Sequence, residues 1–230
     1  MNSTKKQARI AAILYLLACS TAPFSLHYLP RALVVPGDAT ATATLVRASE
    51  TLLRMGIASE LIISIVLIFA VLAFYRLFKG VSEKHALAML ILLMVSIPIS
   101  FLNVLNEIAA LILVSGAGFL SVFGQRQLDA LVLLFLRLHS HGLFLAGIFW
   151  GLWLFPFGIL IMRSGFIPRV VGIFVILAGV PYVVSAFTTL VLPQYAYLSR
   201  FLTVLAFGEF ALLWLVIKGA KERPSDALAS

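Results

Sequence analysis

Six apolar segments, each about as long as a membrane-spanning helix, constrain the fold of this chain more than any other feature. At a rise of 1.5 Å per residue, about 20 residues cross a hydrocarbon core of about 30 Å. No polar stretch between the segments is long enough to fold as a separate domain. The sequence therefore predicts an all-α polytopic membrane helix bundle in one transmembrane domain, residues 1–230, with spans at 9–29, 54–77, 86–114, 136–162, 170–192 and 200–217.

The composition agrees with a membrane protein and narrows its partners. Charged residues make up only 11% of the chain, against roughly a quarter in a typical soluble domain. The net charge of +8 is typical of a membrane protein whose cytoplasmic loops carry Lys and Arg residues beside anionic lipid. We therefore expect membrane lipids as partners and no nucleic acid. The single cysteine, Cys19, excludes an intrachain disulfide.

The basic residues predict the orientation of the spans. Eleven Lys and Arg residues lie near the two termini and in the loops after the second and fourth spans, against five in the other connections. By the positive-inside rule, both termini lie in the cytoplasm, as in a multi-pass protein of the inner (plasma) membrane. The basic start followed by an apolar run also resembles a signal peptide, but the run continues to Leu29, which favours a retained first span.

Two of the outer connections have helical patterns of their own. Asp38 follows a Pro-Gly turn and is a candidate N-cap, and Arg47, Glu50 and Arg54 have the spacing of helical ion pairs. This pattern predicts a short outer helix between the first and second spans. The segment "GQRQLDALVLLF" predicts that the fourth helix begins before its apolar span.

Five segments of the chain carry a family resemblance. They are, in order, "VPGDATATA", "RMGIASEL", "VFGQRQLDALVLLFLRLHSHG", "RSGFIPRVVG" and "GEFALLWLVIKG". Together they resemble the bacterial membrane-protein family known as domain of unknown function 4386, over residues 8–219. The resemblance implies a helical membrane domain and brings no activity with it.

Ionisable residues inside the spans are the first candidates for function, because each costs about 2.5 kcal/mol or more at the bilayer centre. Counted along its helix, Glu209 lies close to mid-membrane and Glu60 in the outer half. In the third span, Ser96, Ser100, Asn103 and Glu107 form one helical stripe, with Asn106 beside it. Serines in such a stripe usually hold helices together, whereas Asn103 is as consistent with a ligand site as with packing.

The stretch "LRLHSHG" places an Arg and two His near the outer end of the fourth span. Arg137 and His141 are four residues apart and share a helical face, so the pair is expected to approach Glu107 at a similar depth. The alternative is that Arg137 only reaches the lipid headgroups. His139 and His141 are two residues apart, about 200° around a helix, which disfavours one metal ion held by both.

Small residues and prolines predict how the spans pack. Gly147 and Gly151 form a small-xxx-small pair that permits close approach of another helix. Pro98, Pro156 and Pro181 are candidate kinks in the third, fourth and fifth spans. A homo-oligomer is compatible with these faces.

The polar groups gather in the outer halves of the spans, which predicts a polar cavity open to the outer face. The candidate ligand-binding residues are Glu60, Asn103, Glu107, Arg137, His141 and Glu209. No catalytic residue, metal ligand or cofactor is assigned, because no Ser-His pair, HExxH or CxxC spacing is present.

The sequence leaves three functions open. The first is binding or transport of a small polar or lipid-like ligand, coupled to protons through the carboxylates. The second is an intramembrane enzyme that uses Glu and His as acid and base on a lipid or isoprenoid. The third is a structural or signalling subunit without a small-molecule ligand.

Overall fold

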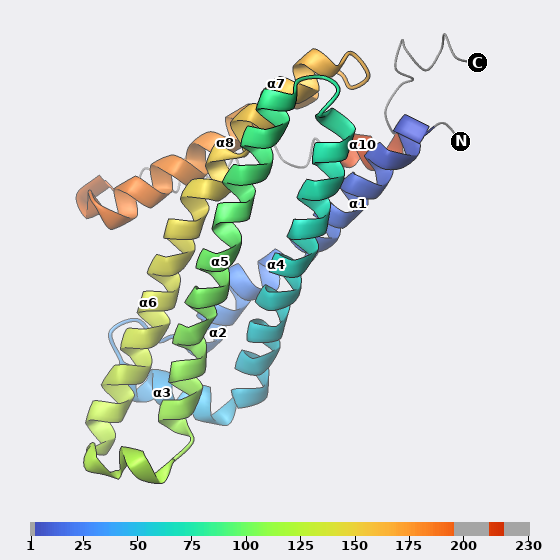
Figure 1. Cartoon of the computed structure of the whole chain (residues 1–230). Coiled ribbons are helices and arrows are strands. Elements are labelled where there is room, and N and C mark those ends of the chain that lie inside the picture. The colour runs from blue at the N-terminus through green and yellow to red at the C-terminus, as the bar shows by residue number, and fades with distance from the viewer. Residues whose placement is uncertain (1–2, 196–211, 219–230) are drawn as a thin grey trace. The chain divides into compact units, whose positions relative to one another are not determined.

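A computed structural model describes residues 3–195 and 212–218 of the chain, and these residues form helices without a strand (Figure 1). The all-α prediction is confirmed. The elements are α1 (Ser3–Pro23), the π-helical turn η1 (Phe24–Tyr28), α2 (Leu29–Leu33), α3 (Ala39–Ala48), α4 (Glu50–Phe78), α5 (Glu83–Val114), the 3-10 turn η2 (Gly118–Val122), α6 (Gln125–Leu152), α7 (Leu154–Ser164), α8 (Arg169–Leu190), η3 (Pro193–Tyr195) and α10 (Leu213–Ile217).

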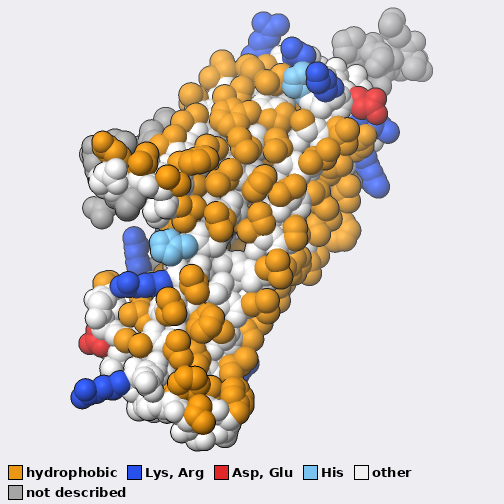
Figure 2. All heavy atoms as spheres, turned by 60° about the vertical axis from the view of Figure 1, so that its left-hand side comes forward, with side chains coloured by type: hydrophobic (Ala, Val, Ile, Leu, Met, Phe, Trp, Pro, Cys, Tyr) orange, Lys and Arg blue, Asp and Glu red, His pale blue; other side chains and the backbone are white. Residues whose placement is uncertain are grey.

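Five helical segments within the described residues are long and apolar enough to cross a membrane. They are Thr4–Leu33, Glu50–Phe78, Glu83–Val114, Gln125–Ser164 and Arg169–Leu190, and they contain most of each of the first five predicted spans. The predicted sixth span, 200–217, lies outside the described residues except for α10 and Leu212. Hydrophobic side chains cover most of the face in Figure 2, as expected of a multi-pass membrane protein.

The chain divides into two compact units. Unit 1 comprises residues Met1–Leu17, Val66–Ile97 and Phe144–Ser230, and unit 2 comprises Ala18–Ile65 and Pro98–Leu143. The predicted single transmembrane domain stays a prediction.

Unit 2 contains the helix that was predicted between the first two spans. Asp38 caps α3 by accepting a hydrogen bond from the Ala41 N–H at 2.9 Å, as its position after the Pro-Gly turn predicts. Gly37 supplies the positive φ of 81° in that turn. The core of the unit brings α3 against α2, α4, α5 and α6, through buried residues that include Leu33, Val46, Leu53, Leu111 and Leu136.

The charges around α3 pair differently from the pattern that the sequence predicts. Arg54 and Glu50 form the expected i,i+4 contact at 3.5 Å. Arg47 instead pairs with Asp129 of α6, whose side chain is almost fully buried. The α3–α6 pair joins segments 82 residues apart, so the short-range spacing could not reveal it.

Unit 1 is built around aromatic rings and a break in the fourth span. Phe157 contacts Phe74, Phe78 and Trp153, with ring centroids 4.6 to 5.8 Å apart. α6 ends at Leu152 and α7 begins at Leu154, shortly before Pro156, because proline has no N–H for the carbonyl four residues earlier. Pro98 and Pro181 lie within α5 and α8.

The topology is open to a direct test. A reporter fused at the C-terminus and one inserted near residue 120 are expected to lie on opposite sides of the membrane, with the C-terminus inside. The reason is the excess of basic residues near the termini and in the loops after the second and fourth spans. Paired alkaline phosphatase and fluorescent-protein fusions measure this. The same side for both positions would contradict the six-span arrangement.

A buried carboxylate and histidine cluster in unit 2

Three helices of unit 2 each contribute one ionisable side chain to a common point. Glu60 comes from α4, Glu107 from α5 and His139 from α6, and one ligand atom from each lies within 4.8 Å of the other two. His139 Nε2 is 3.2 Å from Glu60 Oε1 and 3.8 Å from Glu107 Oε1. All three residues are buried, with Glu107 only 2% exposed. Such groups are rarely buried unless they are paired or hold an ion.

Asn103 holds the imidazole from the other side. Its Nδ2 donates a hydrogen bond to the backbone carbonyl of His139 at 2.9 Å, and His139 Nδ1 lies 3.4 Å from the Asn103 carbonyl oxygen. Asn106 in turn donates to Asn103 Oδ1 at 3.2 Å. A Cβ at Gly142 would overlap the Asn103 amide, so glycine is required there for α6 to approach α5 this closely. The contacts fix the plane of the ring and leave Nε2 facing the two carboxylates.

The carboxylates have no lysine or arginine partner in the part of the chain that the structure describes. Within the described chain, neither Glu60 nor Glu107 forms an ion pair with Lys or Arg. The arginines of unit 2 are engaged elsewhere or exposed: Arg47 pairs with Asp129, Arg54 pairs with Glu50, and Arg31, Arg126 and Arg137 are exposed. Among the described residues, Glu60 Oε1 and Glu107 Oε2 are buried without a hydrogen-bond partner, and the contact of Glu60 Oε1 with His139 Nε2 at 3.2 Å is an ion pair. The cluster is thus short of positive charge or donors.

A small cavity adjoins the cluster. Its volume is about 20 Å³, and Glu107, His139, Ser25 and Ser140 line its polar side. The rest of the wall is apolar and comes from Leu29, Pro30, Leu33, Val34, Leu53 and Leu136. A cavity that holds one water needs about 10–15 Å³, so this space accepts a water molecule or an ion.

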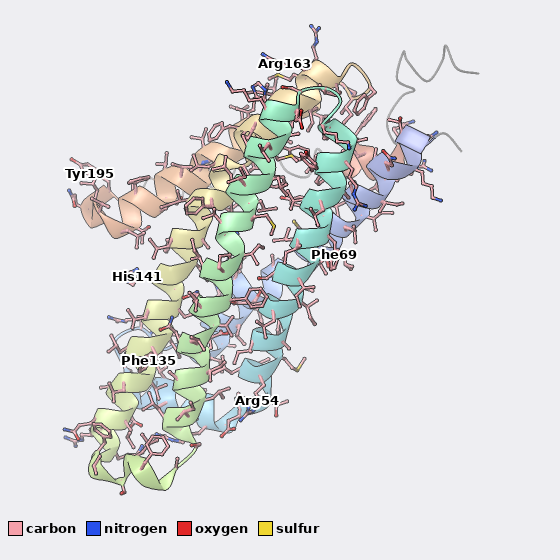
Figure 3. The ribbon with its side chains drawn as sticks, in the orientation of Figure 1. Arg54, Phe69, Phe135, His141, Arg163 and Tyr195 are labelled. Carbon is pink, nitrogen blue, oxygen red and sulfur yellow. The ribbon has the colours of Figure 1, made fainter. Side chains whose placement is uncertain are left out.

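The structure brings together half of the residues that the sequence named as candidates. Glu60, Asn103 and Glu107 lie in one cluster, whereas the side chains of Arg137 and His141 are exposed. Figure 3 shows His141 on the side of α6 turned away from α5. The expected approach of Arg137 and His141 to Glu107 is therefore corrected. Glu209 lies outside the described residues.

His139 takes the place that the sequence assigned to His141. The two residues lie about 200° apart around the helix, so burying one exposes the other. The serines of the α5 stripe, Ser96 and Ser100, are buried as their pattern predicts. Gly142 is the sequence feature that could have identified His139. A glycine in α6 marks the face that contacts α5, and His139 lies one turn before Gly142 on the same face.

The polar residues of α8 are not part of this cluster. Tyr182, Ser185 and Thr189 have the spacing of one helical face, and they are half-buried and belong to unit 1. In α8 it is Thr188 that is buried, and its hydroxyl donates to the Val184 carbonyl at 2.8 Å within its own helix. The predicted polar cavity open to the outer face stays a prediction.

Comparison with known proteins identifies a family without assigning an activity. The family described as "Domain of unknown function (DUF4386)" matches residues 10–219 of the chain. No curated protein and no solved structure matches the chain.

Proposed function

The chain belongs to this family of unknown function, and we propose that it is a multi-pass protein of the bacterial inner (plasma) membrane that binds a small cation at the Glu60–Glu107–His139 cluster. The observation that carries the proposal is the pair of buried carboxylates that have partnerless oxygens and only His139, with no Lys or Arg, beside them in the described chain. In an apolar surrounding, two such groups attract a positive ligand strongly, because little solvent screens them.

The size of the cavity supports a small ligand over a lipid-like one. A space of about 20 Å³ accepts a water molecule or a metal-sized ion. The small cation is therefore favoured over the lipid-like ligand that the sequence left open. Transport of the ligand and its coupling to protons stay predictions of the sequence.

The two alternative functions gain less support. An enzyme that uses Glu and His as acid and base on a lipid or isoprenoid needs room for its substrate beside them, but the cavity at Glu107 and His139 has a volume of only about 20 Å³. A purely structural subunit does not require carboxylate oxygens that are buried without partners, because each one costs free energy.

The proposal is tested by thermal unfolding of the full-length protein in detergent with a panel of cations. The panel contains sodium, potassium, ammonium, methylammonium, guanidinium and divalent metal ions. A cation that binds only the folded protein stabilises it by about 2.7 kcal/mol at 100 times its dissociation constant. We expect at least one cation to raise the unfolding temperature of the wild type and to have no such effect on Glu107→Gln.

Glu50→Gln is the matched control, because Glu50 lies on the outer turn of α4 in a weak surface pair with Arg54. This variant is expected to respond to the cation as the wild type does. Equal responses of wild type and Glu107→Gln to every member of the panel would contradict the proposal.

A further inference from the structure

The donor set of the cluster points to one class of cation. Resting on the proposed function and deepening it, we infer that Glu60, Glu107 and His139 bind a single divalent first-row transition-metal ion, of the Mn²⁺, Fe²⁺ or Zn²⁺ type. Carboxylates suit manganese, and imidazole suits iron and zinc, whereas calcium and magnesium prefer oxygen ligands alone. The three donors come from three different helices, so the ion would join α4, α5 and α6.

The spacing of the donors is close to that of a metal site. Bonds from such ions to oxygen or nitrogen are about 2.0–2.2 Å long, so two ligands of one four-coordinate ion lie about 3.3–3.6 Å apart. The three donor atoms lie within 4.8 Å of one another. Bringing the two most distant atoms to that separation needs a combined shift of about 1 Å, which side-chain rotations supply.

The contact from Asn103 gives the histidine the orientation of a metal ligand. Metal-binding histidines usually donate their second ring N–H to a carbonyl or carboxylate, which fixes the tautomer and the ring plane. His139 Nδ1 lies 3.4 Å from the Asn103 carbonyl oxygen and 3.3 Å from Asn103 Nδ2, and in the tautomer that donates to the carbonyl a lone pair stays on Nε2. Nε2 faces two carboxylate oxygens, at 3.2 and 3.8 Å. A metal ion bound to Nε2 and both carboxylates would take the place of the proton that Nε2 otherwise carries between them.

The partnerless carboxylate oxygens are an independent observation that points to a ligand. Glu107 Oε2 has no hydrogen bond from any residue that the structure describes, although the Glu107 side chain is only 3% exposed. Glu60 Oε1, on a side chain 9% exposed, likewise accepts none from this part of the chain. Buried acceptors of this kind in native proteins are usually satisfied by a hydrogen bond, water or an ion.

The cavity supplies an open coordination position. Glu107 and His139 belong both to the cluster and to the cavity wall, so a metal ion held by them faces a space that accepts one water molecule. Three protein ligands and one water are typical of catalytic zinc sites, whereas structural zinc sites are closed by four protein ligands. The inferred ion therefore keeps one coordination position for a water molecule.

The test is a titration of the chelator-treated, full-length protein in detergent with Co²⁺, followed by its visible d–d absorption. We expect saturable absorption for one ion per chain in the wild type. Glu107→Gln and His139→Leu are expected to lose it, while Glu50→Gln and His27→Ala, which change exposed or weakly paired groups in unit 2, keep it. Asn103→Leu removes the positioning contact and is expected to weaken binding by about 10–100-fold, with an altered spectrum of the bound ion.

A second measurement uses the wild type alone, so its result does not depend on whether the variants fold. X-ray absorption of the zinc-loaded wild type is expected to show imidazole and oxygen ligands at about 2.0–2.2 Å. Sulfur in the coordination shell would assign the ion to Cys19 and overturn the inference, as would an ion surrounded by water alone. Absence of saturable Co²⁺ absorption in the wild type, or equal absorption in the ligand variants, also overturns it.

The outcomes separate this inference from the proposed function. If no metal ion binds but ammonium or guanidinium stabilises the protein in a Glu107-dependent way, the metal site is contradicted and the small-cation site of the proposed function stands. If neither metal ions nor organic cations bind, both the metal site and the proposed function are contradicted.

Discussion

Replacing His139 by leucine in metal-free protein is expected to lower the free energy of unfolding by about 3–5 kcal/mol, the usual cost of removing one partner from a buried charged group. His139 is the one described side chain within ion-pair distance of Glu60 and Glu107. Leucine would leave both carboxylates in an apolar interior with no partner. Unfolding in detergent with added denaturant, in the presence of a chelator, measures the change.

The triple variant Glu60→Leu, Glu107→Leu and His139→Leu provides the decisive comparison. Replacing a whole buried charged cluster by apolar residues of similar volume is often neutral or stabilising. We therefore expect the triple variant to be more stable than His139→Leu alone, a non-additive result typical of residues in contact. His141→Leu is the matched control on the same helix, with an expected change within about 0.5 kcal/mol because its side chain is exposed. Additive losses, or a larger loss for His141→Leu, would show that the cluster does not act as a unit.

The fold could be predicted from the sequence because its signals are local. The length of each apolar segment predicts a helix, and Asp38 after a Pro-Gly turn predicts the start of α3. The early start of the fourth helix at Gln125 follows from the polar residues before its apolar run. Each of these features depends on a few neighbouring residues or on the length of an apolar segment, and the sequence shows both directly.

The candidate site could be predicted only in part, because the rotation of α6 is not encoded locally. The apolar residues of α6 itself occur on every face of the helix, so hydrophobic periodicity does not indicate which face contacts α5. The polar stripe of α5 has one face and correctly predicts that Asn103 and Glu107 are buried. For α6 the choice between His139 and His141 needed the contact of Gly142 with Asn103. The pair between Arg47 and Asp129 depends in the same way on tertiary contacts.

Glycine spacing in unit 1 also carries information that a search for small-xxx-small pairs misses. A Cβ added at Gly147 would meet no atom of the described residues within 4 Å, so within that part of the chain this glycine does not form the close contact that its pairing with Gly151 predicts. Gly151 instead approaches Gly179 of α8, and seven residues later Gly158 approaches Gly172. The equal spacing of seven in both segments, in opposite directions, fits two antiparallel helices in contact along two turns.

Alanine at Gly158 is accordingly expected to destabilise unit 1 by about 1–3 kcal/mol, the usual cost of overpacking, and leucine by more. A Cβ at Gly158 would lie 2.6 Å from the Gly172 carbonyl oxygen, and a Cβ at Gly172 would lie 2.6 Å from the Gly158 carbonyl oxygen. Backbone cannot rotate away as a side chain can, so α7 and α8 would have to separate.

Gly147→Ala is the control, and it is expected to be neutral or to stabilise by up to about 1 kcal/mol because alanine favours the helix. Thermal and denaturant unfolding of the four single alanine variants at 151, 158, 172 and 179 should show losses at each position. A loss at Gly147 equal to that at Gly158 would mean that helix propensity or lipid contact, and not the close approach of α7 to α8, sets the requirement for glycine.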